Sequence, residues 1–319
     1  MRRAAALVLT PLIAALALAG CSSSSSSSSS AAASSSDSYK SVTVTGDFGK
    51  APKVTIPKVK GSGDLLTKTL IQGNGDTFSS SEGLIGNYVA YDWTGTTSKQ
   101  LGSSFTTGTP SLFVGSLLPG LESALSGQKV GSRVLAVIPP KDAFGTGGNS
   151  TEGIGATDTL VFVIDMNSTF PTNLTAKQTS NGGGSLPTVT QAASATAAPT
   201  VKIDTKATPP KTLQVKPLIK GTGAVVKKGQ DIAVQYDGFI WRTGASFQSS
   251  YSQNTPFTTP IGAGQVIPGW DTGLVGQTVG SRVLLVIPPA QGYGTTGAST
   301  VGIKGTDTLV FVVDILAAV

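Results

Sequence analysis

The sequence predicts two α+β domains in tandem, each an antiparallel sheet packed on one short helix. Gly (40 residues) and Pro (18 residues) are frequent among the 319 residues and charged residues make up only 13%, which favours short strands joined by many turns. Two motifs occur twice at a constant spacing. Within each copy, segments with the alternation of strands outnumber the one segment with helical spacing.

The N-terminal segment has the pattern of an export signal. Arg2 and Arg3 precede an apolar run over residues 4–19. Pro11 interrupts this run, which is shorter than the roughly 20 residues of a membrane-spanning helix. We therefore expect a signal peptide over residues 1–20. Residues 21–39 are rich in Ser and Ala, cannot bury a core and are expected to form a flexible tether.

The end of this segment resembles the bacterial lipobox. Residues 18–21 read Leu-Ala-Gly-Cys, and Cys21 is the only cysteine of the chain. The resemblance implies that Cys21 becomes the first mature residue and carries a diacylglycerol; a plain exported protein with an incidental cysteine is the alternative. Two acyl chains bind a membrane stably, so we expect an extracytoplasmic protein that is lipid-anchored to the cell membrane.

An internal repeat defines the domains. Residues 130–140 (VGSRVLAVIPP) recur at 279–289 with one difference, and residues 157–165 (TDTLVFVID) recur at 306–314 with one difference. Both pairs are 149 residues apart, a spacing of tandem globular domains rather than of a solenoid. We expect domains at 40–167 and 209–319. The Gly, Ala, Ser and Pro content of residues 168–208 predicts a mobile linker between them.

Strand patterns are clear in the second copy. In residues 231–237 the apolar side chains alternate, which places Tyr236 on the buried face of a half-buried strand. Residues 282–286 and 309–313 are rich in β-branched and aromatic side chains and predict two further strands. Arg282, at the start of one of them, is expected to be solvated.

One segment of the second copy has helical spacing. It begins near Pro268, and Trp270 and Leu274 lie four residues apart, on one face of a helix. An antiparallel sheet packed on this single short helix follows.

Composition excludes several classes of chemistry. Histidine is absent, so catalytic systems that pair a Ser or Cys nucleophile with His, and metals bound by His, are excluded. A single cysteine excludes an internal disulfide. The net charge of +6 includes Arg2 and Arg3, and the lysines are scattered, which argues against a nucleic-acid partner. We expect no cofactor and no metal.

With these motifs in place, the second copy resembles the FKBP-type peptidyl-prolyl cis-trans isomerases over nearly all of residues 211–318. The motifs that support the resemblance agree in order and spacing: residues 234–238 (VQYDG), 244–247 (GASF), 256–257 (PF), 264–271 (GQVIPGWD), 279–282 (VGSR), 292–294 (GYG) and 309–311 (LVF). The resemblance implies two FKBP-like domains, each with an antiparallel sheet of five or six strands wrapped around one short helix. It also implies a shallow apolar pocket between the sheet and the helix.

The resemblance also implies a set of site residues. It places Trp270 at the floor of the pocket under the substrate proline, and it gives the Tyr293 hydroxyl and the backbone N–H of Ile267 as hydrogen-bond donors to substrate carbonyls. The residues implied to line the pocket are Tyr236, Phe247, Phe257, Val266, Ile267, Trp270, Tyr293, Ile303 and Phe311.

The implied reaction suits the composition. Rotation about an X-Pro bond crosses a barrier of about 18–20 kcal/mol that arises from amide resonance and breaks no bond, so it needs neither nucleophile nor metal. An apolar pocket favours the twisted amide, which carries less charge on its oxygen. We expect an isomerase that assists exported proteins, with proline-containing polypeptides as partners. A non-catalytic chaperone or proline-segment binding module, and a pair of inert spacer domains, are the alternatives.

Both copies depart from the family pattern. In the second, Gln248 replaces the acidic residue that usually follows the Phe of the Gly-x-x-Phe motif. In the first, the Trp is replaced by Leu121 and the loop Tyr by Phe144, so we expect a folded domain with weak or no activity; a slowly working leucine pocket is the alternative. The matching positions in the first copy are expected to be Tyr91, Phe105, Thr106, Leu117, Leu118, Leu121, Phe144, Ile154 and Phe162.

Overall fold

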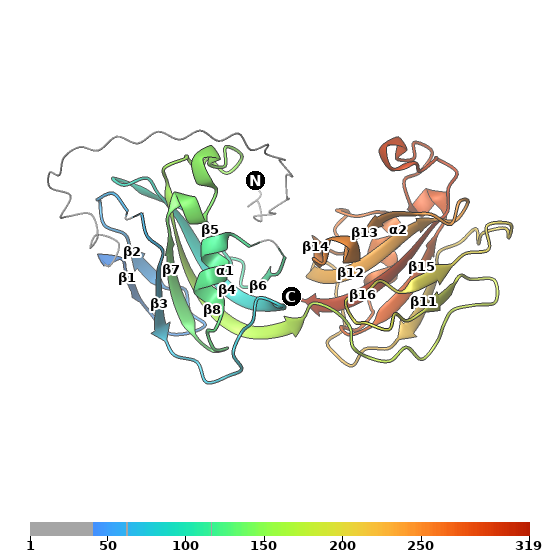
Figure 1. The fold of residues 1–319 in the computed structure, drawn as a ribbon, viewed down its shortest axis with the longest axis horizontal. Helices are drawn as coiled ribbons and strands as arrows, with labels where there is room; N and C mark the ends of the chain where they lie inside the picture. The colour runs from blue at the N-terminus through green and yellow to red at the C-terminus, as the bar shows by residue number, and fades with distance from the viewer. Residues whose placement is uncertain (1–40, 62, 116) are drawn as a thin grey trace, which may run out of the picture. The chain divides into compact units, whose positions relative to one another are not determined.

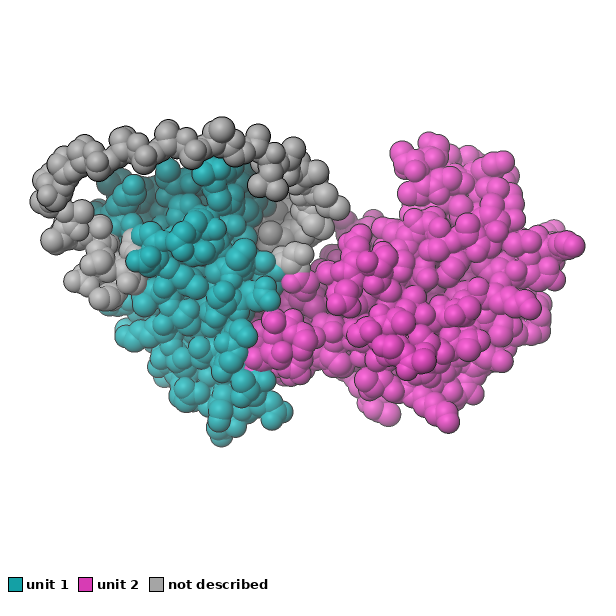
Figure 2. All heavy atoms as spheres, in the orientation of Figure 1, with its two compact units in different colours: residues 1–77, 87–109, 116–166 teal, residues 78–86, 110–115, 167–319 magenta. Residues whose placement is uncertain are grey.

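The computed structural model describes residues 41–61, 63–115 and 117–319. The predicted signal peptide, the lipidation site Cys21 and the predicted tether lie outside these residues. The chain divides into two compact units (Figure 2). The first comprises residues 1–77, 87–109 and 116–166, and the second comprises residues 78–86, 110–115 and 167–319. In the part of the chain that the structure describes, no helix has the length and apolar character needed to cross a membrane.

The first repeat contains a six-stranded antiparallel sheet, as predicted (Figure 1). Its strands follow the order β3-β7-β8-β4-β5, and β6 pairs with the free edge of β4 beside β5. The helix α1 spans Pro119–Leu125 and packs on β7. The strands are β3 (Leu66–Ile71), β4 (Glu82–Trp93), β5 (Ser98–Ser103), β6 (Ser111–Phe113), β7 (Arg133–Ile138) and β8 (Thr159–Pro171).

The second repeat has the same topology. Its sheet follows the order β11-β15-β16-β12-β13, β14 pairs with β12, and the helix α2 (Pro268–Leu274) packs on β15. The predicted fold class is therefore confirmed for both repeats. The strands are β11 (Gln214–Ile219), β12 (Asp231–Ile240), β13 (Ser246–Ser249), β14 (Phe257–Pro260), β15 (Arg282–Ile287) and β16 (Leu309–Ala318).

Each helix lies unusually close to its sheet because a glycine faces the strand. A Cβ atom on Gly269 would lie 2.5 Å from Cγ2 of Ile287, and one on Gly120 would lie 2.4 Å from Cγ2 of Ile138. Such distances are too short for two carbon atoms, so the helices could not pack at this depth with any larger residue. This close packing places Trp270, the residue after Gly269, against the inner face of the second sheet.

The inner face of the second sheet forms the main core with α2. Alternation along β12 places Val234 and Tyr236 on this face, and Tyr236 is only 5% exposed, as its position in the pattern predicts. The outer face is apolar as well, because Phe239, Trp241 and the outward side chains of β15 and β16 form a second buried cluster. A sheet that is apolar on both faces needs a cover on each.

A short β-hairpin covers the outer face of the second sheet. It is formed by β9 (Thr188–Thr190) and β10 (Thr200–Lys202), and Val189 at its centre is fully buried among the outward residues of the sheet. The prediction of a mobile linker over residues 168–208 missed this hairpin. The Gly- and Ala-rich composition hid the structure, because only Val189 and a few partly buried neighbours make the contact. The second structural unit therefore begins well before residue 209.

The first repeat has an equivalent hairpin. The strands β1 (Thr43–Thr45) and β2 (Lys53–Thr55) pair with each other, and their valines pack with Leu135, Val137 and Trp93 on the outer face of the first sheet. The duplicated unit is thus a hairpin followed by the six-stranded sheet and its helix.

A buried ion pair occupies the outer face of each sheet, and this corrects the prediction for Arg282. That side chain is not solvated: it is 3% exposed, and its Nε and Nη2 atoms donate hydrogen bonds of 2.6 and 2.7 Å to the two carboxylate oxygens of Asp314. The Tyr251 hydroxyl donates a third, of 2.7 Å, to Asp314. In the first repeat Arg133 and Asp165 form the same pair, with Nε–Oδ1 and Nη2–Oδ2 distances of 2.6 and 2.7 Å.

Candidate active site

Four aromatic rings meet edge to face on the inner side of the second sheet. Trp270 is at their centre: its ring lies 5.2 Å from that of Tyr236 and 5.4 Å from that of Phe311, with interplanar angles of 85° and 86°. Phe247 packs at 5.6 Å on the other side of Phe311, also edge to face. These are the spacings and angles that aromatic pairs prefer, so the floor of the site is rigid.

Two further rings stand at the edge of this cluster. Phe257 lies 5.8 Å from Tyr236 and 6.3 Å from Trp270, and 40% of its surface is exposed. Tyr293 is 38% exposed, whereas Trp270 is 4% exposed. The buried rings thus form a floor and the exposed rings form a rim. An apolar side chain or ring entering from solvent would contact both.

A glycine in β12 makes room for two of the rings. A Cβ atom on Gly238 would lie 2.7 Å from Cε1 of Phe311 and 3.0 Å from Cζ of Phe247. The residue opposite Gly238 on β13 is Gln248, so its side chain is directed toward the same face of the sheet.

The loop before α2 is held by a carboxylate that the sequence analysis did not single out. Asp271 accepts hydrogen bonds of 2.6 and 2.8 Å from the backbone N–H groups of Gly262 and Gly264, one on each oxygen. Both glycines have a positive φ, near +72°, which a larger residue rarely adopts. These two bonds fix the segment that carries Val266 and Ile267 to the start of the helix. Asp271 therefore shapes the pocket without lining it.

A second ion pair holds the loop that carries Ile303. Arg242 donates hydrogen bonds of 2.8 and 2.9 Å to the carboxylate of Asp307, which also accepts one of 2.8 Å from the backbone N–H of Lys304. The Arg242 side chain is 42% exposed, so the pair contributes little to stability, although it restricts the loop. The guanidinium group lowers the pKa of Asp307, which therefore stays ionised at neutral pH.

The site offers neutral hydrogen-bond donors. Burial, and to a lesser degree the neighbouring Tyr293 and Asp237, raises the pKa of Tyr236; burial also raises the pKa of Tyr293. Both phenols therefore keep their protons at physiological pH. The backbone N–H of Ile267, at the start of α2, makes no hydrogen bond with any residue that the structure describes. A peptide carbonyl placed over the rings would find donors on two sides.

Eight of the nine residues implied for the second pocket lie together, and the ninth, Tyr293, is close enough for its charge to act on the Tyr236 phenol. Tyr236, Trp270, Ile303 and Phe311 are buried in the inner core cluster, and Phe247, Val266 and Ile267 pack against it while partly exposed. Phe257 joins them through its ring contacts. Within the described parts of the chain, no group of three or more acidic or cysteine side chains could hold a metal ion.

The strand register corrects three of the matches expected in the first repeat. The backbone N–H of Tyr88 donates to Ser104 Oγ at 2.8 Å, as that of Tyr236 does to Ser250 Oγ at 2.8 Å. Tyr88, not Tyr91, is therefore the counterpart of Tyr236. Tyr91 belongs to the buried cluster on the outer face.

By the same register, Phe105 and Thr106 do not line the first pocket. Phe105 follows Ser104 as Tyr251 follows Ser250, and its ring lies 6.0 Å from the guanidinium carbon of Arg133 on the outer face. Thr106, which bonds the carbonyl of Ser103, lies in the turn after it. By register, Leu101 takes the place of Phe247, and Ser111 that of Phe257.

The remaining positions of the first repeat lie where they were expected. Leu118 precedes α1 as Ile267 precedes α2, Leu121 occupies the place of Trp270, and Ile154 forms the same β-bridge as Ile303. Leu118, Leu121, Ile154 and Phe162 are all buried, whereas Phe144 and Leu117 are partly buried. The first pocket therefore keeps two rings, Tyr88 and Phe162, but lacks the central ring of Trp270 and the rings of Phe247 and Phe257.

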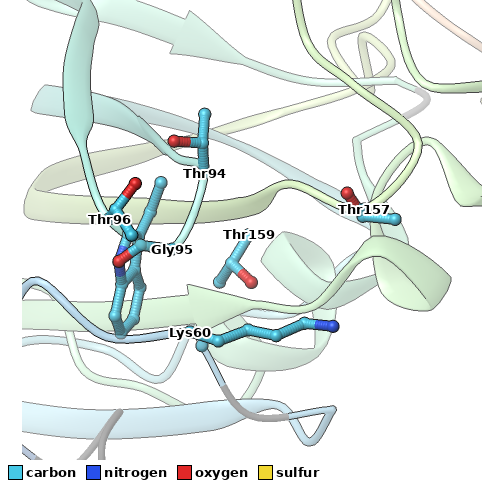
Figure 3. A pocket seen from close by; sticks show the side chains of 8 residues that line it. Lys60, Thr94, Gly95, Thr96, Thr157 and Thr159 are labelled. Carbon is cyan, nitrogen blue, oxygen red and sulfur yellow. The ribbon is translucent and has the colours of Figure 1, made fainter.

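A separate cavity of about 350 Å³ lies in the first unit (Figure 3). It contains none of the positions that correspond to the aromatic pocket. Its wall combines part of Trp93, two glycines, the side chain of Lys60 and four threonines: Thr94, Thr96, Thr157 and Thr159.

The six-stranded sheet and the short helix packed on its inner face define a small α+β domain that is present twice in this chain. Both repeats match the family described as FKBP-type peptidyl-prolyl cis-trans isomerase, over residues 80–167 and 223–316, which is more than half of the chain. The chain belongs to this family and contains two of its domains.

Relatives of this chain include several FK506-binding proteins. It is 42% identical over 109 residues to one from Streptomyces anulatus, covering 34% of this chain and 88% of that protein. It is 40% identical over 104 residues to one from Neisseria meningitidis, covering 33% and 94%. It is 50% identical over 88 residues to FK506-binding protein 2B of Rhizopus delemar, covering 28% and 42%.

Two solved structures are also similar. The crystal structure of AtFKBP13 is 32% identical, covering 34% of this chain and 93% of that one, with a TM-score of 0.31. The structure of the three FKBP domains of wheat FKBP73 is 21% identical, covering 80% of this chain and 94% of that one, with a TM-score of 0.32.

Proposed function

We propose that the second domain catalyses the cis-trans isomerisation of X-Pro bonds in polypeptides. The observation that supports this most directly is the set of edge-to-face rings around Trp270, buried at the floor and open at a rim formed by Phe257 and Tyr293. A proline ring fits such an apolar site. Isomerisation needs no bond to break, only a lower barrier to rotation.

In this mechanism the pocket binds the twisted X-Pro amide more strongly than the planar one, and this difference lowers the barrier to rotation. Trp270 and Phe311 would contact the proline ring, while the amide rotates in surroundings from which the rings exclude water. The twisted amide carries less charge on its oxygen than the planar form and is favoured there. The neutral Tyr293 hydroxyl and the N–H of Ile267 would hold neighbouring carbonyls, so that only the X-Pro bond turns.

The first domain is proposed to contribute little or no isomerase activity. Leu121 in place of Trp270 removes the ring on which the proline would lie, Phe144 in place of Tyr293 removes a hydroxyl donor, and Ser111 in place of Phe257 removes one of the two rings of the rim. We infer that this domain serves as a folded spacer or a weak binding module.

Location and partners are part of the same proposal. A diacylglycerol on Cys21 would tether the chain to the outer face of the cell membrane, where newly exported, proline-containing polypeptides fold. Uncatalysed proline isomerisation takes about 10–100 s at 25 °C and can limit folding, so an anchored isomerase would act where its substrates emerge.

The test is a proline-limited peptide or refolding assay with the full chain. Trp270→Leu reproduces the residue of the first repeat and is expected to lower kcat/KM by about tenfold or more. The substitution removes the indole ring that would contact the substrate proline, and a loss of about 1.4 kcal/mol of transition-state binding corresponds to tenfold in rate. Phe144→Leu, at the equivalent of Tyr293 in the first domain, is the matched control and should leave the rate unchanged.

Two results would reject the proposal. One is the absence of any acceleration by the unmodified chain; the other is an undiminished rate in Trp270→Leu. Suppression of aggregation without acceleration would favour the non-catalytic binding module instead. Activity that remains in Trp270→Leu but disappears on further substitution of Leu121 would show that the first domain is active.

A further inference from the structure

The cavity in the first unit has a polar wall and lies outside the aromatic pocket (Figure 3). Three segments form this wall: residues 60–61, residues 93–96 at the end of β4, and Thr157 with Thr159 at the start of β8. All three belong to the first unit. Trp93 and Val161, two residues along β8 from Thr159, pack in the cluster on the outer face of the first sheet. By alternation Thr159 and the cavity lie on the outer face as well.

The hydroxyl of Thr159 is a buried polar group directed into this cavity. The side chain is 4% exposed, and its Oγ1 atom makes no hydrogen bond with any residue that the structure describes. The oxygen is not among the sealed polar atoms of the described chain, so it borders the cavity that Thr159 lines. A Cβ atom on Gly61 would lie 2.6 Å from this oxygen, so the glycine leaves it uncovered. A hydroxyl buried without a partner costs free energy, and a ligand that accepts its proton would remove that cost.

The charge on this side of the sheet favours an anion. Among the described residues that line the cavity, Lys60 is the one with a charged side chain, and Figure 3 shows it extending beside Thr159. Asp158 and Asp92 lie at positions of the opposite face by alternation, and they are close enough for their charges to interact. Asp158 also accepts a hydrogen bond of 2.6 Å from the backbone N–H of Gly155. The described wall of the cavity therefore contains an ammonium group and no carboxylate.

The donors of the cavity suit a tetrahedral oxyanion. The hydroxyls of Thr96 and Thr157 also make no hydrogen bond with a described residue, so donors approach from the turn after β4 and from the segment before β8. The turn is held in place because Trp93 Nε1 donates a hydrogen bond of 3.1 Å to the carbonyl of Gly95. Lysine binds phosphate as a point charge, whereas a planar carboxylate is recognised best by the fork of an arginine, which the described wall lacks.

We propose that this cavity binds the phosphate ester of a small polyol or sugar, with the phosphate against Lys60 and Thr159. Its volume of about 350 Å³ lies in the range of small-molecule sites, about 300–1,000 Å³. The hydroxyls of Thr96 and Thr157 can donate to, or accept from, the hydroxyls of the polyol. The same chemistry occurs in a soluble phosphate ester and in the headgroup of a glycerophospholipid. The inference concerns the first repeat alone and does not rest on the isomerase function.

The test is a titration of the full chain with glycerol phosphate, followed by the NMR shifts of the Gly61 and Gly95 amides and of the Trp93 indole N–H. Glycerol is the uncharged control. Thr159→Val preserves the shape of the side chain but removes the hydroxyl, and Lys60→Gln removes the charge. Each substitution should weaken the binding of glycerol phosphate about tenfold or more, because each removes a hydrogen bond to a charged group.

Two substitutions provide matched controls. Thr308→Val is the same change at the equivalent position of the second repeat, and Lys58→Gln removes an exposed charge that does not line the cavity. Both should leave the affinity within about twofold. Vesicles of phosphatidylglycerol, mixed with the unlipidated chain, identify the source of the phosphate. Cosedimentation that Thr159→Val abolishes would assign the site to a lipid headgroup, and cosedimentation that is absent or unchanged would assign it to soluble esters.

Several results would overturn the inference. They are the absence of saturable shifts with glycerol phosphate, equally tight binding of glycerol, an undiminished affinity in Thr159→Val, and equal losses in Lys60→Gln and Lys58→Gln. Since no described residue bonds the Thr159 hydroxyl, Thr159→Val should not lower the urea midpoint of unfolding, and a lowered midpoint would indicate a structural role instead. The isomerase rate should be the same in all these variants, so failure of this inference leaves the proposed function intact.

Discussion

Val189 tests whether residues 168–208 are a linker or part of the second domain. This side chain is fully buried against the outer face of the second sheet, in a cluster with Trp241, Leu284 and Val286. A mobile linker would make no such contact. The substitution Val189→Ala removes two methyl groups from the cluster without changing the polarity of the hairpin.

The expected cost follows from the burial. Removing one buried methylene, as in Ile→Val, costs about 0.5–1.5 kcal/mol, so removing two methyl groups at a site with no solvent exposure should cost about 1–3 kcal/mol. Val201 provides the matched control, because it pairs directly with Val189 across the hairpin but is only partly buried. Val201→Ala should therefore lose roughly half as much or less.

Urea unfolding of the full chain measures the loss, and native-state hydrogen exchange locates it. Amides of β15 and β16 should exchange faster in Val189→Ala, because the outer cover of these strands is weakened, whereas amides of β7 in the first repeat should be unaffected. A change within about 0.5 kcal/mol, as for an ordinary surface substitution, would refute the assignment of the hairpin to the second domain. So would equal losses in Val189→Ala and Val201→Ala.

Two further predictions concern buried charges. Arg282→Met leaves the carboxylate of Asp314 buried without its cation and should cost about 3–5 kcal/mol in urea unfolding, more than Tyr251→Phe, at about 1–3 kcal/mol; the reverse order would contradict the ion pair as the main partner. In the first domain, burial and the adjacent carboxylate of Asp158 raise the pKa of Asp92. The folded state then binds this proton more tightly than the unfolded state, so the free energy of unfolding should fall as the pH rises above the ordinary aspartate range, near 4. Asp92→Asn should remove this fall in denaturant titrations between about pH 4 and 8, and a fall of the same size in the variant would argue against Asp92 as its source.

The parts of the fold that could be predicted are those in which the alternation of apolar residues along a strand agrees with the burial of one face of the sheet. The period-two alternation in residues 231–237 predicts both a strand and the buried face of Tyr236, and the structure confirms both. The residues of the second pocket also lie together, because their motifs are spread over a sheet and a helix whose packing the glycines at 269 and 273 fix at close range. The choice of these residues follows from the family resemblance, not from spacing along the chain alone.

The incorrect matches in the first repeat arise from an error in strand register. The match of Tyr91 to the pocket is wrong because the turns between strands differ in length, so a constant spacing of 149 residues does not hold across β4 and β5. A slip by an odd number of residues, such as the three that separate Tyr88 from Tyr91, exchanges the two faces of a strand. Hydrogen bonds from Tyr88 and Tyr236 to equivalent serines show the register, and no composition or periodicity could replace them.

Arg282 could have been predicted from the pattern of its own strand. The side chains of residues 282, 284 and 286 lie on the same face of the strand. Leu284 and Val286 are apolar, so this face is not expected to be solvated. Asp314 lies opposite Arg282 in the pairing of β15 with β16. An arginine and an aspartate that face each other across two apolar strands indicate a buried pair, whereas a single strand considered alone suggests a surface residue.

Comparison of the two repeats separates residues that maintain the fold from residues that form the site. Arg133 and Asp165 repeat as Arg282 and Asp314, with the same two hydrogen bonds at the same lengths, because a buried charge that loses its partner destabilises either domain equally. The floor of the pocket is under no such constraint, since a leucine fills the position of Trp270 in the first repeat and the core there remains buried. Identity at the ion pair therefore follows the requirements of folding, whereas the ring at the centre of the second pocket is not required for a buried core. By this argument the rings of the second pocket are present for a function that packing alone does not demand.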